Sequence, residues 1–160
     1  MRFRYLGLAA FLILALLFVA NSGIRRDDIP GDPIITVDFP ATAEGGSIQD
    51  AVFHVENPGP GDMGSLFLSF ARVGIAMPIV DPGVNKENPN IVAIEPEPVA
   101  VSPDAVIFRF EGLEEGEATT ITFSLRIPEI TGEAANSVVA YAGEDETRAK
   151  GIRLTTQVGG

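Results

Sequence analysis

Apolar and polar residues alternate along much of the chain after residue 33, and this period of two is typical of half-buried β-strands. The clearest example is residues 119–127, where every second side chain from Ile121 to Ile127 is apolar and the residues between them are Thr, Ser and Arg. By the same pattern, further strands are predicted at residues 34–39, 51–56, 65–74, 91–94, 99–101, 105–110, 137–142 and 152–158.

Glycine-containing turns separate these predicted strands at short intervals. They occur at residues 44–46, 57–61, 81–83, 111–112, 115–116 and 143–144. Roughly seven to nine short strands with turns every 8–12 residues are the pattern of a β-sandwich. We therefore predict a single all-β domain over residues 34–160, joined to the N-terminus by a polar linker at residues 25–33.

An apolar segment precedes this domain. Arg2 and Arg4 form its positive end, and residues 6–20 are apolar without interruption. Positive charge stays on the cytoplasmic side of a membrane, so the domain is predicted on the periplasmic or extracytoplasmic side. The residues expected to contact the lipid bilayer through an N-terminal helix are Leu6, Phe11, Leu12, Ile13, Leu14, Leu16, Leu17 and Phe18.

Residues 1–24 fit two kinds of targeting segment. A membrane-spanning helix needs about 20 apolar residues, a length that residues 3–24 reach only if the side chain of Arg4 extends to the membrane interface. A cleaved signal peptide has about 7–15 apolar residues followed by small residues, and Ala20 and Ser22 stand where such small residues are needed. Of the two, we favour the uncleaved membrane anchor.

Charge and cysteine content exclude several classes of function. The formal net charge is −11, and residues 21–160 carry 9 basic against 22 acidic residues, a net charge of −13. A surface this negative repels phosphate backbones and anionic lipid headgroups, so nucleic acid is not expected as a partner. Because the chain has no Cys, disulfides, thiolate nucleophiles and zinc–thiolate sites are excluded.

Candidate catalytic and metal-binding groups are few. His54 is the only histidine, and no G-x-S-x-G nucleophile turn accompanies it. We therefore expect His54 to be a surface residue on a strand, and we predict no enzymatic activity and no cofactor. Carboxylates gather in the turns, where they suit a hard cation such as Ca²⁺, but none forms an ordered EF-hand loop. A weak Ca²⁺ site stays open on the sequence.

Three short stretches resemble prokaryotic cell-surface repeat domains of the N-x-G-P turn family. Residues 55–60 (VENPGP) resemble its V-x-N-x-G-P strand-to-turn, residues 113–117 (LEEGE) are similar to its L-x-P-G-E turn, and residues 135–139 (ANSVV) look like its x-N-x-A-x-V strand. Glu115 stands where the family usually has Pro. The resemblance implies an immunoglobulin-like antiparallel β-sandwich that serves as an adhesive or scaffolding module and has no catalytic residues.

Two segments are candidates for contact with a partner. Residues 73–80 are apolar and form either a core strand that leads into a crossover or an exposed patch for a protein partner. Residues 95–98 contain two prolines and form a stiff edge that either protects a sheet or docks a partner. The candidate partner-binding residues are Ile75, Met77, Ile79, Val80, Pro96 and Pro98.

The predicted function follows from one anchor, one small sandwich and no assembled chemistry. We predict a non-enzymatic, membrane-anchored protein that stabilises a larger membrane protein complex as an accessory subunit, for example a photosynthetic or respiratory complex. The alternative is a secreted or cell-surface binding and adhesion module whose signal peptide is cleaved.

Overall fold

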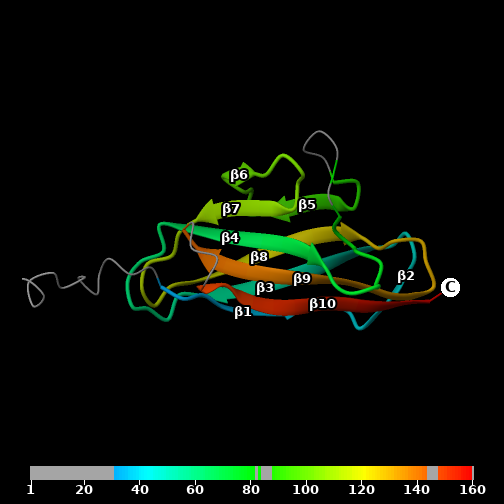
Figure 1. Cartoon of the computed structure of the whole chain (residues 1–160), viewed down its shortest axis with the longest axis horizontal. Helices are drawn as coiled ribbons and strands as arrows, with labels where there is room; N and C mark the ends of the chain where they lie inside the picture. The colour runs from blue at the N-terminus through cyan, green and yellow to red at the C-terminus, as the bar shows by residue number, and fades with distance from the viewer. Residues whose placement is uncertain (1–30, 82, 84–87, 144–147, 160) are drawn as a thin grey trace, which may run out of the picture.

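The computed structural model describes residues 31–81, 83, 88–143 and 148–159, and these residues form ten β-strands and no helix (Figure 1). The predicted anchor at residues 1–24 and most of the linker lie outside this part of the chain. No helix able to cross a membrane is present among the described residues. The strands are β1 (Ile34–Asp38), β2 (Thr42–Glu44), β3 (Ile48–Glu56), β4 (Ser65–Arg72), β5 (Ile91–Glu95), β6 (Ala100–Val101), β7 (Ile107–Glu111), β8 (Ala118–Arg126), β9 (Gly132–Ala142) and β10 (Lys150–Gly159).

The strands form two sheets that pack face to face. One sheet has four strands in the order β1-β3-β8-β5, and the other has six in the order β2-β10-β9-β4-β7-β6. All neighbouring strands are antiparallel except β2 and β10, which run parallel. The prediction of a wholly antiparallel sandwich is wrong at this edge, because the chain crosses from β1 in one sheet to β2 in the other without reversing direction.

Strand order identifies the architecture as immunoglobulin-like. In chain order, β1, β3, β4, β5, β8, β9 and β10 occupy the places of strands A to G, with A-B-E-D in one sheet and C-F-G in the other. The hairpin of β6 and β7 adds two strands to the free edge of β4, and β2 borders β10. The predicted all-β sandwich is therefore confirmed.

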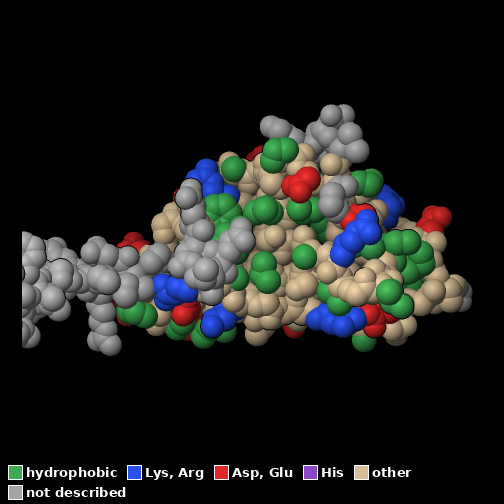
Figure 2. All heavy atoms as spheres, viewed as in Figure 1, with side chains coloured by type: hydrophobic (Ala, Val, Ile, Leu, Met, Phe, Trp, Pro, Cys, Tyr) green, Lys and Arg blue, Asp and Glu red, His purple; other side chains and the backbone are tan. Residues whose placement is uncertain are grey.

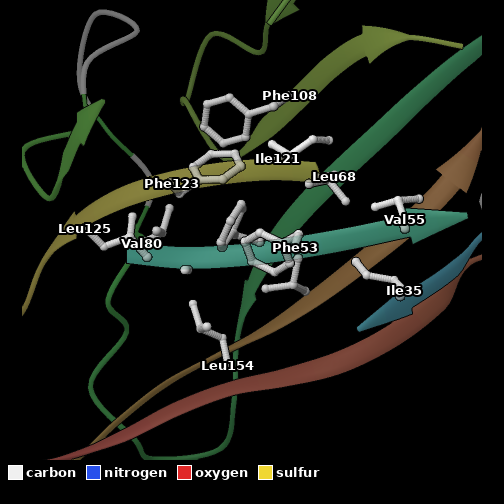
Figure 3. Close-up of a cluster of buried hydrophobic side chains, with 14 of the residues drawn as sticks. Ile35, Phe53, Val55, Leu68, Val80, Phe108, Ile121, Phe123, Leu125 and Leu154 are labelled. Atoms are coloured by element: carbon white, nitrogen blue, oxygen red, sulfur yellow. The ribbon is translucent and has the colours of Figure 1, made fainter. Parts of the chain in front are cut away.

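Alternating side chains of both sheets fill the space between them. Phe123 of β8 lies between Phe53 and Phe108 at the centre of an aromatic cluster (Figure 3). Its ring centroid is 5.8 Å from that of Phe53, 5.1 Å from those of Phe70 and Phe108, and 6.4 Å from that of Phe110. These ring pairs all meet edge to face, the arrangement that aromatic quadrupoles favour. The period of two seen in the sequence thus corresponds to one shared core.

Each strand predicted from the sequence overlaps an observed strand, with shifts at the ends. The largest shift is in β9, which begins at Gly132 rather than at residue 137. Its early residues Ala134, Ala135 and Asn136 are all buried, so they show no alternation of apolar and polar positions. The three-residue strand β2 was not predicted, because so short a segment carries no periodic signal.

Candidate functional site

Residues 73–80, here named the apical loop, connect β4 to the segment that leads to β5, and they do not form a regular strand. The backbone turns at Gly74, and the N–H of Ala76 donates a 3.1 Å hydrogen bond to the C=O of Val73. The side chain of Ile75 at this turn is fully exposed, and Met77 is 47% exposed. The loop therefore carries an apolar tip that faces solvent.

The second half of the apical loop turns inward. Ile79 is 0% exposed and Val80 is 1% exposed, and both belong to the hydrophobic core. Of the apolar residues predicted to contact a partner in this loop, Ile79 and Val80 are therefore unavailable. That prediction is corrected, because these two side chains anchor the loop and only Ile75 and Met77 point outward.

Asn136 of β9 holds the buried part of the loop in place, and its own exposure is 0%. Its Oδ1 accepts hydrogen bonds from the N–H groups of Ile79 (3.0 Å) and Val80 (2.9 Å). Its Nδ2 donates to the C=O of Val80 at 2.7 Å and to the C=O of Ala71 at 3.2 Å. One side-chain amide thus satisfies backbone groups that no strand partner reaches.

An ion pair joins the two sides of the loop at its base. Nε of Arg72 donates to Oδ1 of Asp81 at 2.8 Å, and Nη2 donates to Oδ2 at 2.5 Å. These hydrogen bonds, together with the charge of Asp81, raise the pKa of the Arg72 guanidinium above its usual value. Exposed pairs add little to stability, but this two-point contact restricts the geometry of the base. The apolar tip is therefore held on a fixed support.

The second candidate segment lies at the free edge of the four-stranded sheet. Pro96 is exposed and Pro98 is half-buried, directly after β5. β5 pairs only with β8, and its pairing is irregular between Ile91 and Ala93. An irregular edge followed by prolines discourages the addition of another strand, which favours protection of the edge over docking.

A crevice of about 400 Å³ opens between this edge and the six-stranded sheet. Its walls are mainly apolar core residues, with Asn88 and Pro89 at one side. The lining residues are Asn88, Pro89, Ile91, Ile94, Val101, Ala105 and Phe108. The Asn88 side chain already hydrogen bonds the C=O of Asp81 and the N–H of Asn90, so it offers little polar specificity to a ligand.

One group of side chains that the sequence did not suggest is a cross-strand trio around His54. Nε2 of His54 lies 3.2 Å from Oδ2 of Asp38, and Nδ1 lies 3.3 Å from Oγ1 of Thr120. The residue types match an acid–base–nucleophile triad, and they meet because Thr120 is the register partner of His54. Pairing between strands 66 residues apart cannot be seen in a local motif.

The trio has an open surface geometry that does not suit nucleophilic catalysis. The Asp38 side chain is 83% exposed and the His54 side chain 49% exposed, whereas an orienting carboxylate in a catalytic triad is buried. Thr120 is the third residue of β8 and pairs with His54 of β3, so its hydroxyl lies on a regular strand and not on a strained turn. The arrangement is best described as polar cross-strand pairing.

The turn that the family resemblance highlighted lies at the end of the sandwich opposite the apical loop. Nδ2 of buried Asn57 donates to the C=O groups of Gly61 and Leu113, both at 3.0 Å. The neighbouring carboxylates accept backbone hydrogen bonds: Glu115 from the N–H of Gly61, and Asp62 from the N–H of Glu115. No group of three or more His, Cys, Asp or Glu in the described part of the chain is placed to hold a metal ion.

Comparisons with known proteins do not assign a family. No protein-family model and no curated protein matches the chain. The CARDB domain of a Pyrococcus furiosus protein matches with 12% identity and a TM-score of 0.49, over 80% of this chain and 88% of its own. BslA, a bacterial hydrophobin, matches with 8% identity and a TM-score of 0.47, over 79% and 97%.

A cohesin module from Clostridium perfringens matches with 14% identity and a TM-score of 0.41, over 80% of this chain and 97% of its own. Likenesses this distant carry no functional information. Membership of the cell-surface repeat family stays a prediction, and the strand order of the two sheets is what identifies this chain as an immunoglobulin-like β-sandwich.

Proposed function

We propose that this protein is a non-enzymatic interaction module that residues 1–24 hold at a membrane, with its sandwich on the extracytoplasmic side. In this role it is an accessory subunit that stabilises a larger membrane protein complex. The observation that carries the proposal is the position of the apical loop. The described chain begins at residue 31 at one end of the sandwich, and the loop that follows β4 lies at the other end (Figure 1).

This arrangement suits a module that reaches from a membrane to a partner. A domain held through its N-terminus presents the far end of its long axis to whatever lies above the membrane. At that end Ile75 and Met77 are exposed apolar side chains on a fixed loop. Isolated apolar residues on a surface are ordinary, but a fully exposed isoleucine at the tip of a clamped loop is a suitable anchor for a contact.

Elsewhere on the surface formed by the described residues, two other features were candidates, and neither has a geometry suited to catalysis or specific ligand binding. The trio around His54 is open to water, and the crevice beside β5 has little polar specificity. The face shown in Figure 2 carries hydrophobic side chains interspersed with charged ones rather than gathered in one broad patch. A binding or structural role is therefore favoured over catalysis.

The experiment is purification of the full chain from its native membrane in a mild detergent. β10 ends on the same side as the apical loop, so a C-terminal affinity tag is attached through a long flexible linker (Figure 1). The proposal predicts that the chain copurifies with a membrane protein complex at a fixed ratio. Recovery only as a lone monomer, from preparations where other complexes stay intact, would contradict it.

The alternative is a secreted binding module, which is favoured by the small residues Ala20 and Ser22 after the apolar run. In that case the chain is recovered from the soluble extracytoplasmic fraction and lacks its first 20 or so residues. The mature protein then binds its target without a membrane. The anchored subunit retains residues 1–24, whereas the secreted module has lost most of them. The mass of the native chain distinguishes the two.

A further inference from the structure

We propose that the apical loop inserts Ile75 and Met77 into an apolar pocket on a partner protein, and that basic residues surround this pocket. The inference deepens the proposed function and rests on it for the position of the loop away from the membrane.

The loop is preorganised for insertion. Gly74 has a φ of 52°, a left-handed conformation that L side chains rarely adopt, so the turn at the tip is built into the sequence. Asn136 and the pair of Arg72 with Asp81 restrain the two sides of the loop below this turn. A partner therefore does not have to order the loop, and that cost usually weakens association through loops.

Two backbone polar groups near the tip already have partners within the domain, so burying the tip does not leave these two unpaired. The N–H of Ala76 is bonded to Val73 within the turn. The C=O of Met77 accepts a 2.9 Å hydrogen bond from the N–H of Ala135, beside its bridge to Ala134. The exposed apolar groups that the tip offers to a partner are the Ile75 and Met77 side chains, a branched anchor and a flexible one that adapts to irregular pockets.

An apolar tip can contact a second copy of the chain, a lipid bilayer or a pocket on another protein. The negative charge of the domain favours the last of these. Residues 21–160 carry a net charge of −13, so two copies meeting tip to tip repel each other. An anionic bilayer is disfavoured for the same reason, and the anchoring membrane lies toward the other end of the sandwich. A protein pocket with a basic rim is attracted to this domain and accepts the apolar tip.

The test is site-specific photo-crosslinking in intact native membranes. Ile75 is replaced by p-benzoylphenylalanine in the full chain, and the same replacement at Ile34 is the control. Ile34 is also an isoleucine, is 49% exposed, and begins β1 at the opposite end of the sandwich. The inference predicts one protein adduct from position 75 and none of that size from position 34.

Two further readouts separate insertion of the tip from incidental capture. Adding Met77→Ser to the position-75 probe should reduce the adduct several-fold. Raising the ionic strength from about 0.05 M to about 0.5 M should also reduce it about threefold or more, because screening weakens the attraction of a basic rim. An adduct that is unaffected by both changes overturns the inference.

Other outcomes overturn it directly. An adduct of twice the chain mass indicates a second copy, an adduct with lipid indicates the bilayer, and the absence of any adduct at position 75 indicates a free tip. If the chain still copurifies with a complex while position 75 gives no adduct, this inference fails and the proposed function stands. If copurification fails as well, both are rejected.

Affinity measurements then show how much the Ile75 side chain contributes to binding. Ile75→Ser should weaken binding to the purified complex by about 10- to 100-fold, as expected for a buried aliphatic anchor. Ile34→Ser should change it less than about twofold, as for surface residues outside a contact. Because Ile75 is fully exposed, its replacement should leave the melting temperature unchanged, which shows that any loss of binding is local. Equal effects of the two substitutions would contradict the assignment.

Discussion

Asn136→Ala tests the claim that one buried amide builds the support of the apical loop. The substitution removes the partner of the Ile79 N–H, the Val80 N–H and the Val80 C=O, which belong to residues at most 1% exposed. Each buried backbone group left without a hydrogen bond costs about 1–3 kcal/mol. Water that enters the space of the lost amide forms hydrogen bonds with some of these groups. We therefore expect the free energy of unfolding to fall by about 3–5 kcal/mol.

The assay is urea unfolding of the full chain in mild detergent, followed by far-ultraviolet circular dichroism. Ser137→Ala is the matched control, because Ser137 is the next residue of β9, is half-buried, and faces the other side of the sheet. The control should change the free energy of unfolding by no more than about 0.5 kcal/mol. A loss below about 1 kcal/mol for Asn136→Ala would refute the reasoning, because it would mean that the loop finds equivalent hydrogen bonds without the amide.

Four further substitutions test the core, the trio around His54 and two glycines. Phe123→Ala should lower the free energy of unfolding by about 3–5 kcal/mol in the same assay, since it empties the centre of the aromatic cluster; a loss under about 1 kcal/mol would argue against that cluster. Thr120→Val should change stability by less than about 0.5 kcal/mol and leave copurification intact, because the trio is exposed. Gly74→Ala should cost about 1–2 kcal/mol through its backbone conformation alone, because the space around it is open. Gly112→Ala should cost more, because its Cβ would lie 1.6 Å from the C=O oxygen of Met63, and the reverse order would show that this close approach relaxes.

Period-two patterning predicted most of this fold because the sandwich has one dry interior. From Ala51 in β3, Ile121 in β8 and Leu154 in β10, every second residue is buried, so the sequence itself reports which side chains enter the core. The same signal disappears in β9, where Ala134, Ala135 and Asn136 are all covered, and in β2, which is too short. The alternation of apolar and polar residues identifies half-buried strands, but it does not identify segments that are buried on both faces.

The apical loop shows what the sequence could not resolve. Residues 73–80 read as either a strand or an exposed patch, and the structure divides them into an exposed tip and a buried support. That division depends on Asn136, whose side chain reaches the loop from 56 residues away in the sequence. The resemblance pointed to Asn57 and Asn136 as recurring positions, and in the structure each amide fixes a backbone segment that lacks strand partners.

The pairing of strands at the edges of the sheets could not be predicted from the sequence either. The parallel contact between β2 and β10 and the addition of β6 and β7 to β4 depend on where the chain changes sheet, which residue types do not specify. The meeting of Asp38, His54 and Thr120 has the same origin in strand register. These features appear only when the three-dimensional arrangement is known.

Mass spectrometry of the native chain, recovered separately from the membrane and the soluble extracytoplasmic fractions, tests the proposed role most directly. The account predicts a membrane-bound chain that retains the apolar run from Leu6 to Ala20. A soluble chain that begins near Gly23 would contradict the anchored role.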